Sequence, residues 1–392
     1  MSQFDITPKN SNYFYRNNPV RNKQLFNNEN VMPFWIADMD FEIAEPIRAE
    51  LQKLVDRGVF AYENVPPDFY QVMANWFNTK HDFSLKSQYF LAVPGILTGI
   101  SFLIEELTQK GDAILIQTPV YHQFISAIKN TERTLVCNSL RNIDNYYSID
   151  FEVLEEQIVT QQVKMMIFCN PHNPVGRVWT KDEIAQVVAI CQKHSVYLVS
   201  DEVHSEIIFA PNRFTSLGTF EGEKHISILG SSGKTFGLQS IASGFFYISD
   251  NDLRPKLQKR IEALYLNHSN VFTKMATYAA YQKGGEWLTE MLQYVEQNYR
   301  WIQEFLQKEL PQIKILPLEG TYLIWLDFRG LNLPKEELEE LLFQKAAVGF
   351  APGDWFGEDG LGYMRMTISV PREQLERAFD QLKKAFVEAG VS

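Results

Sequence analysis

Short apolar runs separated by helical stretches fill the middle of the chain, from about residue 90 to residue 250. The clearest runs cover residues 113–116, 165–168 and 196–199. Continuous apolar runs of this length are typical of strands buried on both faces, as in a parallel sheet covered by helices. Ligands of such sheets bind beyond the carboxyl ends of the strands. We therefore expect an α/β fold whose functional residues follow these runs.

Helices before and between the runs are predicted from the spacing of apolar residues and from capping residues. Residues 45–55 carry apolar side chains at helical intervals. A second helix is predicted over residues 180–194. Thr180 is a suitable N-cap there, and Glu183 stands three positions later, which is the sequence pattern of a capping box. Helices that alternate with buried strands are expected to cover both faces of the sheet.

The C-terminal third of the chain follows a different pattern. A long helical region covers about residues 252–309. After it we predict two strands, a helix, a strand and a final helix, at residues 312–316, 322–327, 335–346, 363–368 and from 371 onward. This order is typical of a smaller α+β domain.

These patterns predict two domains. The large domain is expected to cover residues 45–283. The small domain is expected to be discontinuous and to combine residues 1–44 with residues 284–392, because the polar N-terminal segment should return and pack on the C-terminal elements. A chain of 392 residues is long enough to give each domain its own core.

Composition and charge exclude several classes of function. The net charge of -11 leaves no basic face for nucleic acid, and no apolar stretch is long enough to span a bilayer. The first residues lack a cationic and apolar leader. Three cysteines without metal-ligand spacing predict buried free thiols and no metal site. We therefore expect a cytoplasmic protein that acts on a small molecule.

Lys234 is the first candidate for chemistry. It stands in a segment of small residues, 231–237, directly after the apolar run 225–230, which reads as a buried strand. An isolated lysine is usually a solvated loop residue. Behind a buried strand, however, desolvation lowers the pKa of an amine toward nucleophilic use.

Two further polar groups follow strand-like runs. Asp201 comes directly after residues 196–200 and should stand at the tip of a central strand, although a surface pair with Glu202 is the plain alternative. Glu202 is expected to be structural, and His204 is either a core histidine or a cofactor contact. Asn173 lies in a turn with two Asx-Pro steps, and turn formation alone would explain that composition.

A lysine, an aspartate and an asparagine at neighbouring strand ends match the needs of pyridoxal 5′-phosphate (PLP). The lysine forms a Schiff base with the cofactor, and a carboxylate keeps the pyridine nitrogen protonated, so that the ring accepts electrons. Asp201 is the expected partner of that nitrogen. Asn173 would donate to the phenolic oxygen, and His204 is the second candidate for that contact.

The phosphate and the substrate also have candidate ligands. Residues 94–100 form a glycine turn that opens a helix, whose free N–H groups suit a phosphate; a simple helix start is the alternative. Ser231 and Ser232 could also bond a phosphate. Tyr121 could stack on a flat ring or only pack in the core. Arg365 lies within an apolar strand pattern. If it faces inward, the carboxylate of a substrate could pair with its charge; the alternative is an arginine that faces outward.

Together these residues resemble the fold-type I PLP enzymes of the class I and II aminotransferase family, over nearly the whole chain from about residue 30. Within that family, residues 32–41 resemble the signature of the MalY/PatB-type cystathionine β-lyases, and so do residues 60–62, 201–204 and 357–365. The decapeptide 32–41 is the most specific of these segments.

The resemblance implies a homodimer with active sites at the subunit interface. Tyr62 would reach the partner subunit's cofactor phosphate, and Ala37 and Asp38 would line the substrate side. The remaining implied contacts are Tyr121 on the ring, Asn173 and Asp201 on its polar atoms, Arg365 on the substrate carboxylate, and Gly95, Ile96, Leu97 and Ser231 on the phosphate.

Two positions depart from the family pattern. The residue before the lysine is usually serine, and here it is Gly233. Many aminotransferases carry a phosphate-binding arginine eight positions after the lysine, where this chain has Ala242. Backbone amides, hydroxyls and the partner subunit's tyrosine must then meet the phosphate charge.

The expected activity is β-elimination from L-cystathionine and other cysteine S-conjugates, giving a thiol, pyruvate and ammonia. An aminotransferase on the same scaffold is the alternative, because both reactions begin with loss of the α-proton. A non-catalytic regulator is a third class, and the complete set of Asn173, Asp201, Lys234 and Arg365 argues against that as the sole role.

Overall fold

A seven-stranded, mostly parallel sheet forms the centre of the molecule. The computed structural model describes residues 2–6, 13–220 and 225–391. In spatial order the strands are β2 (Phe90–Val93), β10 (Gly244–Tyr247), β9 (Ile226–Ser231), β8 (Tyr197–Asp201), β7 (Met165–Cys169), β3 (Ala113–Thr118) and β4 (Thr134–Ser139). Only β10 runs antiparallel to its neighbours. The predicted α/β class is confirmed.

Helices cover both faces of this sheet, because alternate side chains of each buried strand point to opposite sides. Ile114 and Val199 belong to one apolar cluster, whereas Leu115 and Leu198 belong to the other. The first cluster includes side chains of α4 (Ile96–Leu107), α5 (His122–Asn130) and α9 (Leu253–Ala263). The second includes side chains of α3 (Phe69–His81), α6 (Phe151–Thr160), α7 (Lys181–Lys193) and α10 (Val271–Lys283).

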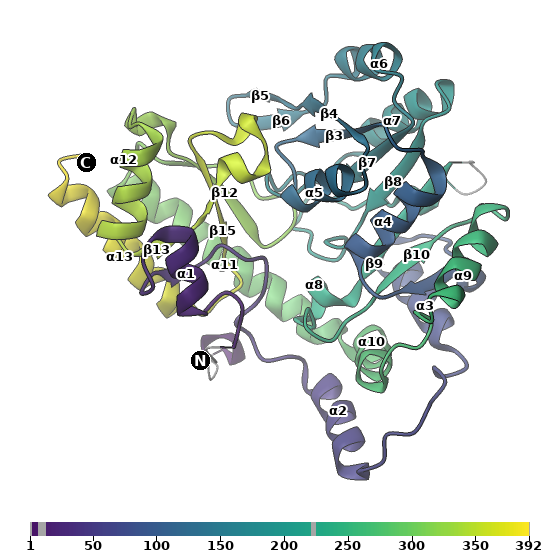
Figure 1. Cartoon of the computed structure of the whole chain (residues 1–392). Coiled ribbons are helices and arrows are strands. Elements are labelled where there is room, and N and C mark those ends of the chain that lie inside the picture. Colours follow the sequence, from purple (N-terminus) through teal and green to yellow (C-terminus); the bar gives the residue numbers. More distant parts are fainter. Residues whose placement is uncertain (1, 7–12, 221–224, 392) are drawn as a thin grey trace.

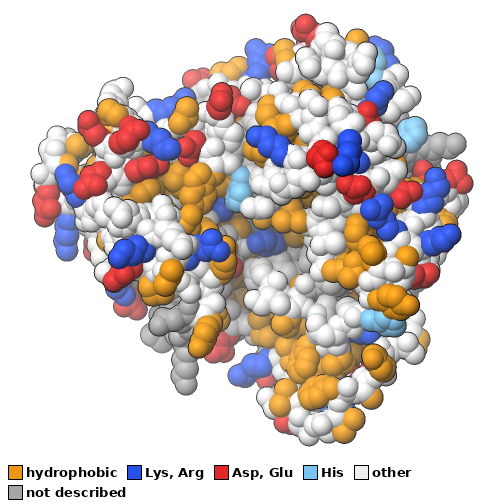
Figure 2. Space-filling view, in the orientation of Figure 1, with side chains coloured by type: hydrophobic (Ala, Val, Ile, Leu, Met, Phe, Trp, Pro, Cys, Tyr) orange, Lys and Arg blue, Asp and Glu red, His pale blue; other side chains and the backbone are white. Residues whose placement is uncertain are grey.

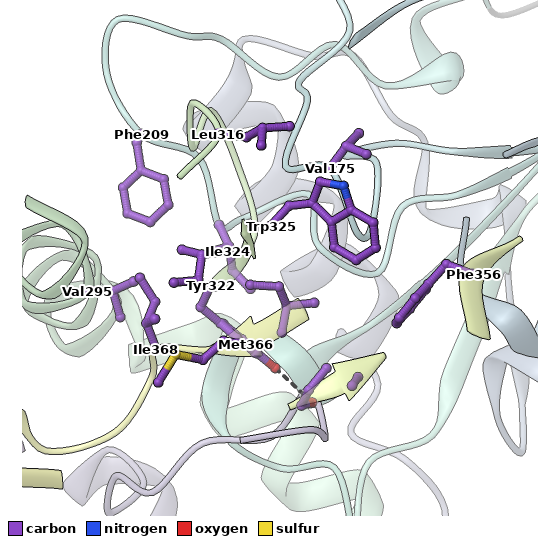
Figure 3. Packing of buried hydrophobic residues seen from close by; sticks show 14 of the residues in the cluster. Val175, Phe209, Val295, Leu316, Tyr322, Ile324, Trp325, Phe356, Met366 and Ile368 are labelled. Carbon is purple, nitrogen blue, oxygen red and sulfur yellow. Dashed lines mark hydrogen bonds between the residues drawn. The ribbon is translucent and has the colours of Figure 1, made fainter. Parts of the chain in front are cut away.

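A second, four-stranded antiparallel sheet lies in the C-terminal part of the chain (Figure 1). Its order is β11 (Lys314–Ile315), β12 (Leu323–Asp327), β15 (Tyr363–Thr367) and β14 (Ala351–Pro352). The helices of this region are α11 (Gly285–Glu309), α12 (Lys335–Glu339) and α13 (Arg372–Glu388). Figure 3 shows Val295 of α11 beside Ile324, Met366 and Ile368, which lie within or next to the central strands.

The N-terminal segment packs against this C-terminal region. Strand β1 (Met32–Pro33) pairs in parallel with β13 (Val348–Gly349), and α1 (Pro19–Phe26) lies beside them (Figure 1). The N-terminal segment therefore returns to the C-terminal elements, as its polar pattern suggested. The domain boundaries themselves stay a prediction.

The remaining elements include α2 (Glu45–Arg57), which packs on α10, and a hairpin of β5 (Arg141–Ile143) and β6 (Tyr146–Ser148). The short helix α8 (Ser232–Phe236) follows β9. Among the described residues, no helix combines the length and the apolar character of a membrane span.

Several predicted elements differ in detail from the structure. The region 252–309 is divided into α9, α10 and α11. Residues 264–270 separate α9 from α10, and Gly284 ends α10 and precedes α11. The predicted helix 335–346 continues from α12 into a π-helix, Glu340–Lys345. The predicted strand 312–316 pairs only over β11.

The three cysteines are free thiols, but the prediction that all are buried is wrong for one of them. Cys169 and Cys191 are buried, whereas Cys137 is exposed. Cys137 lies on β4, at the edge of the sheet, where a strand lacks a neighbour on one side.

The capping box of α7 is present and allows a test of local stability. The Thr180 hydroxyl accepts from the Glu183 N–H at 3.2 Å, and the Glu183 carboxylate accepts from the Thr180 N–H at 2.8 Å. We expect Thr180→Ala to lower the free energy of unfolding by about 1 kcal/mol, because one helix N–H loses its partner. Urea denaturation followed by circular dichroism would measure this. Thr180→Ser, which keeps the oxygen, is the control, and an equal loss in both variants would contradict the assignment.

Candidate active site

One cavity of about 520 Å³ collects most of the predicted site residues. It lies at the carboxyl ends of β7 and β8 and is closed by residues from the N-terminal segment and the C-terminal region. Figure 2 shows that this face of the molecule is hollowed near its centre, with cationic side chains deep inside. Ten of the thirteen predicted residues line the cavity: Ala37, Gly95, Ile96, Leu97, Tyr121, Asn173, Asp201, His204, Lys234 and Arg365.

Lys234 is half-buried and lines this cavity. Helix α8 begins directly after β9, and its N-cap, Ser231, accepts from the Gly233 N–H at 3.1 Å. The Lys234 amine donates to the carbonyl of Ala37. Burial lowers the pKa of Lys234 to about 8, with the nearby positive charge of Arg365 acting in the same direction. The solvated-loop interpretation is therefore wrong.

Asp201 ends strand β8 and is buried beside the lysine. Its carboxylate accepts from the Val203 N–H at 3.1 Å. Burial raises the pKa of Asp201 to about 6. A positively charged group that entered the cavity would lower this pKa again, because an opposite charge favours the ionised carboxylate. The site is thus suited to a protonated heterocycle.

The two neighbours of Asp201 have separate environments. Glu202 faces away from the cavity lining and accepts from Ser216 Oγ at 2.5 Å and from the Leu217 N–H at 2.9 Å, which agrees with its expected structural role. His204 lines the cavity, and its Nδ1 has no hydrogen-bond partner among the described residues. A buried nitrogen without a partner fits a site that is completed by a ligand.

Arg365 points inward from β15 and reaches the loop after β7. Its Nη1 donates to Asn173 Oδ1 at 3.0 Å, and its Nη2 donates to the Trp35 carbonyl at 2.8 Å. The guanidinium carbon lies 4.7 Å from the centre of the Phe356 ring. Its Nε has no partner among the described residues, and burial lowers the pKa of Arg365 to about 10. The outward-facing alternative is wrong, and an anionic ligand would complete this pairing.

The turn at Gly95 opens into the cavity. Gly95 is the N-cap of α4, and a Cβ built there would meet no atom within 4 Å. The first residues of this twelve-residue helix line the cavity, so its unpaired N–H groups suit an anion bound there. Tyr121 lies on another wall of the cavity, and burial raises the pKa of its hydroxyl.

Three predicted residues do not line the cavity. Ser231 uses its hydroxyl within the protein, since it donates to the Ser243 carbonyl at 2.9 Å and caps α8. Asp38 is partly buried and ion-paired with Arg16, whose Nε lies 3.2 Å from Asp38 Oδ1. Tyr62 is fully exposed and lies in a separate surface depression with residues 268–272. Their proposed contacts stay predictions.

Sequence reasoning missed several residues at this site. Arg16 is buried and also pairs with Asp40, which fixes the segment beside the lysine. The Tyr322 hydroxyl donates to the Ala37 carbonyl at 3.2 Å (Figure 3). Trp355 and His122 line the cavity. A sequence signal was present only at the arginine, as a lone cation in an irregular segment, and its partners could not be read from spacing.

These side chains together fit PLP. An unprotonated amine becomes available at Lys234 near pH 8, a carboxylate lies in the same cavity at Asp201, and the helix N-terminus at Gly95 faces open space. The orphaned nitrogens of His204 and Arg365 would gain partners from a ligand with acceptor oxygens.

The charge on Asp38 gives a test of how the lysine is tuned. The pKa of Lys234 is raised by the negative charge of Asp38, against the larger effect of burial. We therefore expect Asp38→Asn to lower the pKa of Lys234 further, by roughly one unit or less. The pH dependence of acetylation of the lysine in ligand-free protein, read by peptide mass spectrometry, would measure it. Asp380→Asn on α13 is the matched control, and a rise in the midpoint for Asp38→Asn would contradict the electrostatic argument.

Comparison with known proteins places the chain in a family. The family model "Aminotransferase class I and II" matches residues 29–382. Cystathionine beta-lyase PatB of Bacillus subtilis is 32% identical, covering 92% of this chain and 94% of its own. A PLP-bound protein from Clostridium difficile 630 that carries an aminotransferase name superposes with a TM-score of 0.93 at 35% identity, over 97% of this chain and 99% of its own. The PLP-bound C-S lyase from Staphylococcus hominis gives 0.92 at 27% identity, over 99% and 98%. The chain therefore belongs to the class I and II aminotransferase family.

Proposed function

We propose that this chain is a PLP-dependent carbon–sulfur β-lyase that cleaves L-cystathionine and other cysteine S-conjugates. One observation carries the proposal: the amine of Lys234 shares a cavity with the Asp201 carboxylate and with the inward-facing Arg365. The names of PatB, a cystathionine beta-lyase, and of the Staphylococcus hominis C-S lyase support this choice within the family.

Each part of the cofactor has a ligand in the proposed site. Lys234 would hold it covalently, and Asp201 would face the ring nitrogen. Tyr121 would lie on the ring, and the N-terminus of α4 would receive the phosphate. Asn173 has its oxygen bonded to Arg365, and its amide nitrogen would donate to the phenolic oxygen, with His204 as a second contact. When bound, PLP supplies an electron sink for a carbanion at the substrate's Cα.

The residues of this chain then position the substrate and move one proton. Arg365 binds the α-carboxylate through donors that face the cavity. The Lys234 amine accepts the α-proton, and it is fit to do so because burial keeps its pKa near 8. Asp38, held by Arg16, lies close enough to act on the charge of this amine. The carbonyl of Ala37 orients the amine.

The proposed reaction consumes one molecule of water for each substrate cleaved. The Cα–H bond gives its proton to Lys234, and the Cβ–S bond breaks with its electron pair leaving on the thiolate. The C=C bond that forms between Cα and Cβ belongs to aminoacrylate, which water hydrolyses to pyruvate and ammonia. The thiolate takes up a proton and leaves as a thiol.

An aminotransferase would use the same residues up to the loss of the α-proton, and the aminotransferase name of the Clostridium difficile protein keeps that alternative in view. The two reactions differ in the next step: a lyase expels the thiolate from Cβ, whereas an aminotransferase leaves the amino group on the cofactor. A lyase needs no second substrate, whereas an aminotransferase stops after one half-reaction unless a keto acid accepts the amino group.

Turnover without a keto acid tests the proposal. We expect the purified protein, supplied with PLP and L-cystathionine alone, to release thiol and pyruvate in large excess over enzyme. Lys234→Ala should reduce this rate by at least about 1,000-fold, because Lys234 is the one lysine among the described residues that line the cavity. Its circular dichroism spectrum should match the wild type. One equivalent of keto acid without any thiol would favour the aminotransferase, and wild-type thiol release from Lys234→Ala would refute the role of the lysine.

We also propose a homodimer with shared active sites, in the cytoplasm. Tyr62 is fully exposed, and Val59 and Phe60 beside it are also exposed. Apolar side chains gathered on one surface are typical of a protein interface. Sedimentation should give twice the 45.4 kDa of one chain, and Tyr62→Phe should weaken PLP retention while leaving that mass unchanged. Sedimentation at the mass of one chain would contradict the dimer.

A further inference from the structure

Four aromatic rings that the proposed function does not use form part of the cavity wall. Trp35 lies at the centre of this wall, with ring centroids 5.7 Å from Tyr15 and 6.4 Å from Trp355. The Trp355 and His122 ring centroids are 6.3 Å apart. All four side chains line the cavity. We call this set the aromatic wall: Tyr15, Trp35, His122 and Trp355.

The charged side chains described in the cavity lining already have roles in the proposed function, so none of them is left to bind a charged group on the substrate sulfur. Among the described lining residues they are Asp201, Lys234 and Arg365, which serve the cofactor and the substrate carboxylate in the proposed function. His122 does not add a charge at neutral pH, because burial and the charge of Arg365 lower its pKa to about 4. Arg21 is outside the lining and packs its guanidinium 4.1 Å from the Tyr15 ring centroid.

Arg365 and Lys234 would hold two substituents of the substrate's Cα, and the third, its side chain, would then face the aromatic wall. The Trp35 carbonyl accepts from Arg365, and the Ala37 carbonyl accepts from Lys234, so one short segment backs both anchors. The substrate carboxylate would lie at Arg365 and the α-hydrogen at Lys234. The side chain would then point to the part of the cavity that these two residues do not occupy. That part includes the Trp35 ring itself and its neighbour Trp355.

We propose that the aromatic wall binds the group carried on the substrate sulfur, and that the preferred substrates are cysteine S-conjugates with uncharged aromatic or large apolar groups. This inference rests on the proposed lyase function. The distal half of cystathionine bears an ammonium and a carboxylate, and both would be desolvated against the rings, because the charged side chains described in the lining are taken by the cofactor and the substrate carboxylate. An aromatic group instead buries its surface against the rings.

A set of four substrates tests the wall with the PLP-loaded enzyme: S-methyl-, S-benzyl- and S-carboxymethyl-L-cysteine, and L-cystathionine. Thiol release gives kcat/KM for each. We expect the value for S-benzyl-L-cysteine to exceed those for cystathionine and S-carboxymethyl-L-cysteine by at least about tenfold. A smaller preference for the benzyl compound would overturn the proposal, and a preference for the carboxymethyl compound would assign the subsite to a cation such as Arg21.

Trp355→Ala separates binding at the wall from leaving-group chemistry. We expect the ratio of kcat/KM for the benzyl and methyl compounds to fall roughly tenfold in this variant, since the bond that breaks is the same in both proteins. Trp355→Phe should restore most of the ratio. Trp301→Ala, which removes a partly buried tryptophan of α11 outside the cavity, is the matched control and should leave the ratio within twofold.

The outcomes distinguish failure of the wall from failure of the lyase proposal. No thiol from any of the four substrates would refute the lyase function itself. Thiol release with a ratio that Trp355→Ala leaves within twofold of the wild type would overturn only the aromatic wall. If Trp355→Ala does not fold, the wild-type substrate series and Trp355→Phe still decide the question.

Discussion

The hydrogen bond from the Lys234 amine to the Ala37 carbonyl is the interaction on which the rest of the site depends. An amine removed from water needs a hydrogen-bond acceptor, and here the acceptor is the Ala37 carbonyl, to which the Tyr322 hydroxyl also donates. The lysine lies on α8, directly after strand β9 of the central sheet, whereas Ala37 comes from the N-terminal segment. The site therefore exists only when that segment is packed across the sheet.

Several hydrogen bonds hold the N-terminal segment against strand β15 and the residues that follow it. The Asp38 carbonyl accepts from Thr367 Oγ1 at 3.2 Å and from Ser369 Oγ at 3.0 Å, and the Asp40 N–H donates to the Ser369 carbonyl at 2.9 Å. Strand β15, which ends at Thr367, also carries Arg365. The group that backs the lysine and the proposed carboxylate anchor are thus parts of one packed unit, and a substrate held between them is fixed in relation to both.

Local features of this structure were predictable from the sequence. The buried strands and the residues that follow them could be read from apolar runs, which is why Asp201 and Lys234 were expected in one place: parallel strands bring their carboxyl ends to the same edge. The capping box at Thr180 is equally local, because its two bonds join residues three positions apart. The resemblance over residues 32–41 pointed to the N-terminal segment without showing what holds it.

The sequence by itself determined the class of fold, the strand ends and the types of residue available for chemistry. Only the tertiary structure decided that Arg365 points inward, that Arg16 pairs with Asp38, and that Trp35 meets Trp355 in a wall. The physical reason is distance along the chain. Spacing predicts contacts within one helix or strand, whereas a contact between residues on separate segments depends on how those segments pack, and no local pattern encodes it.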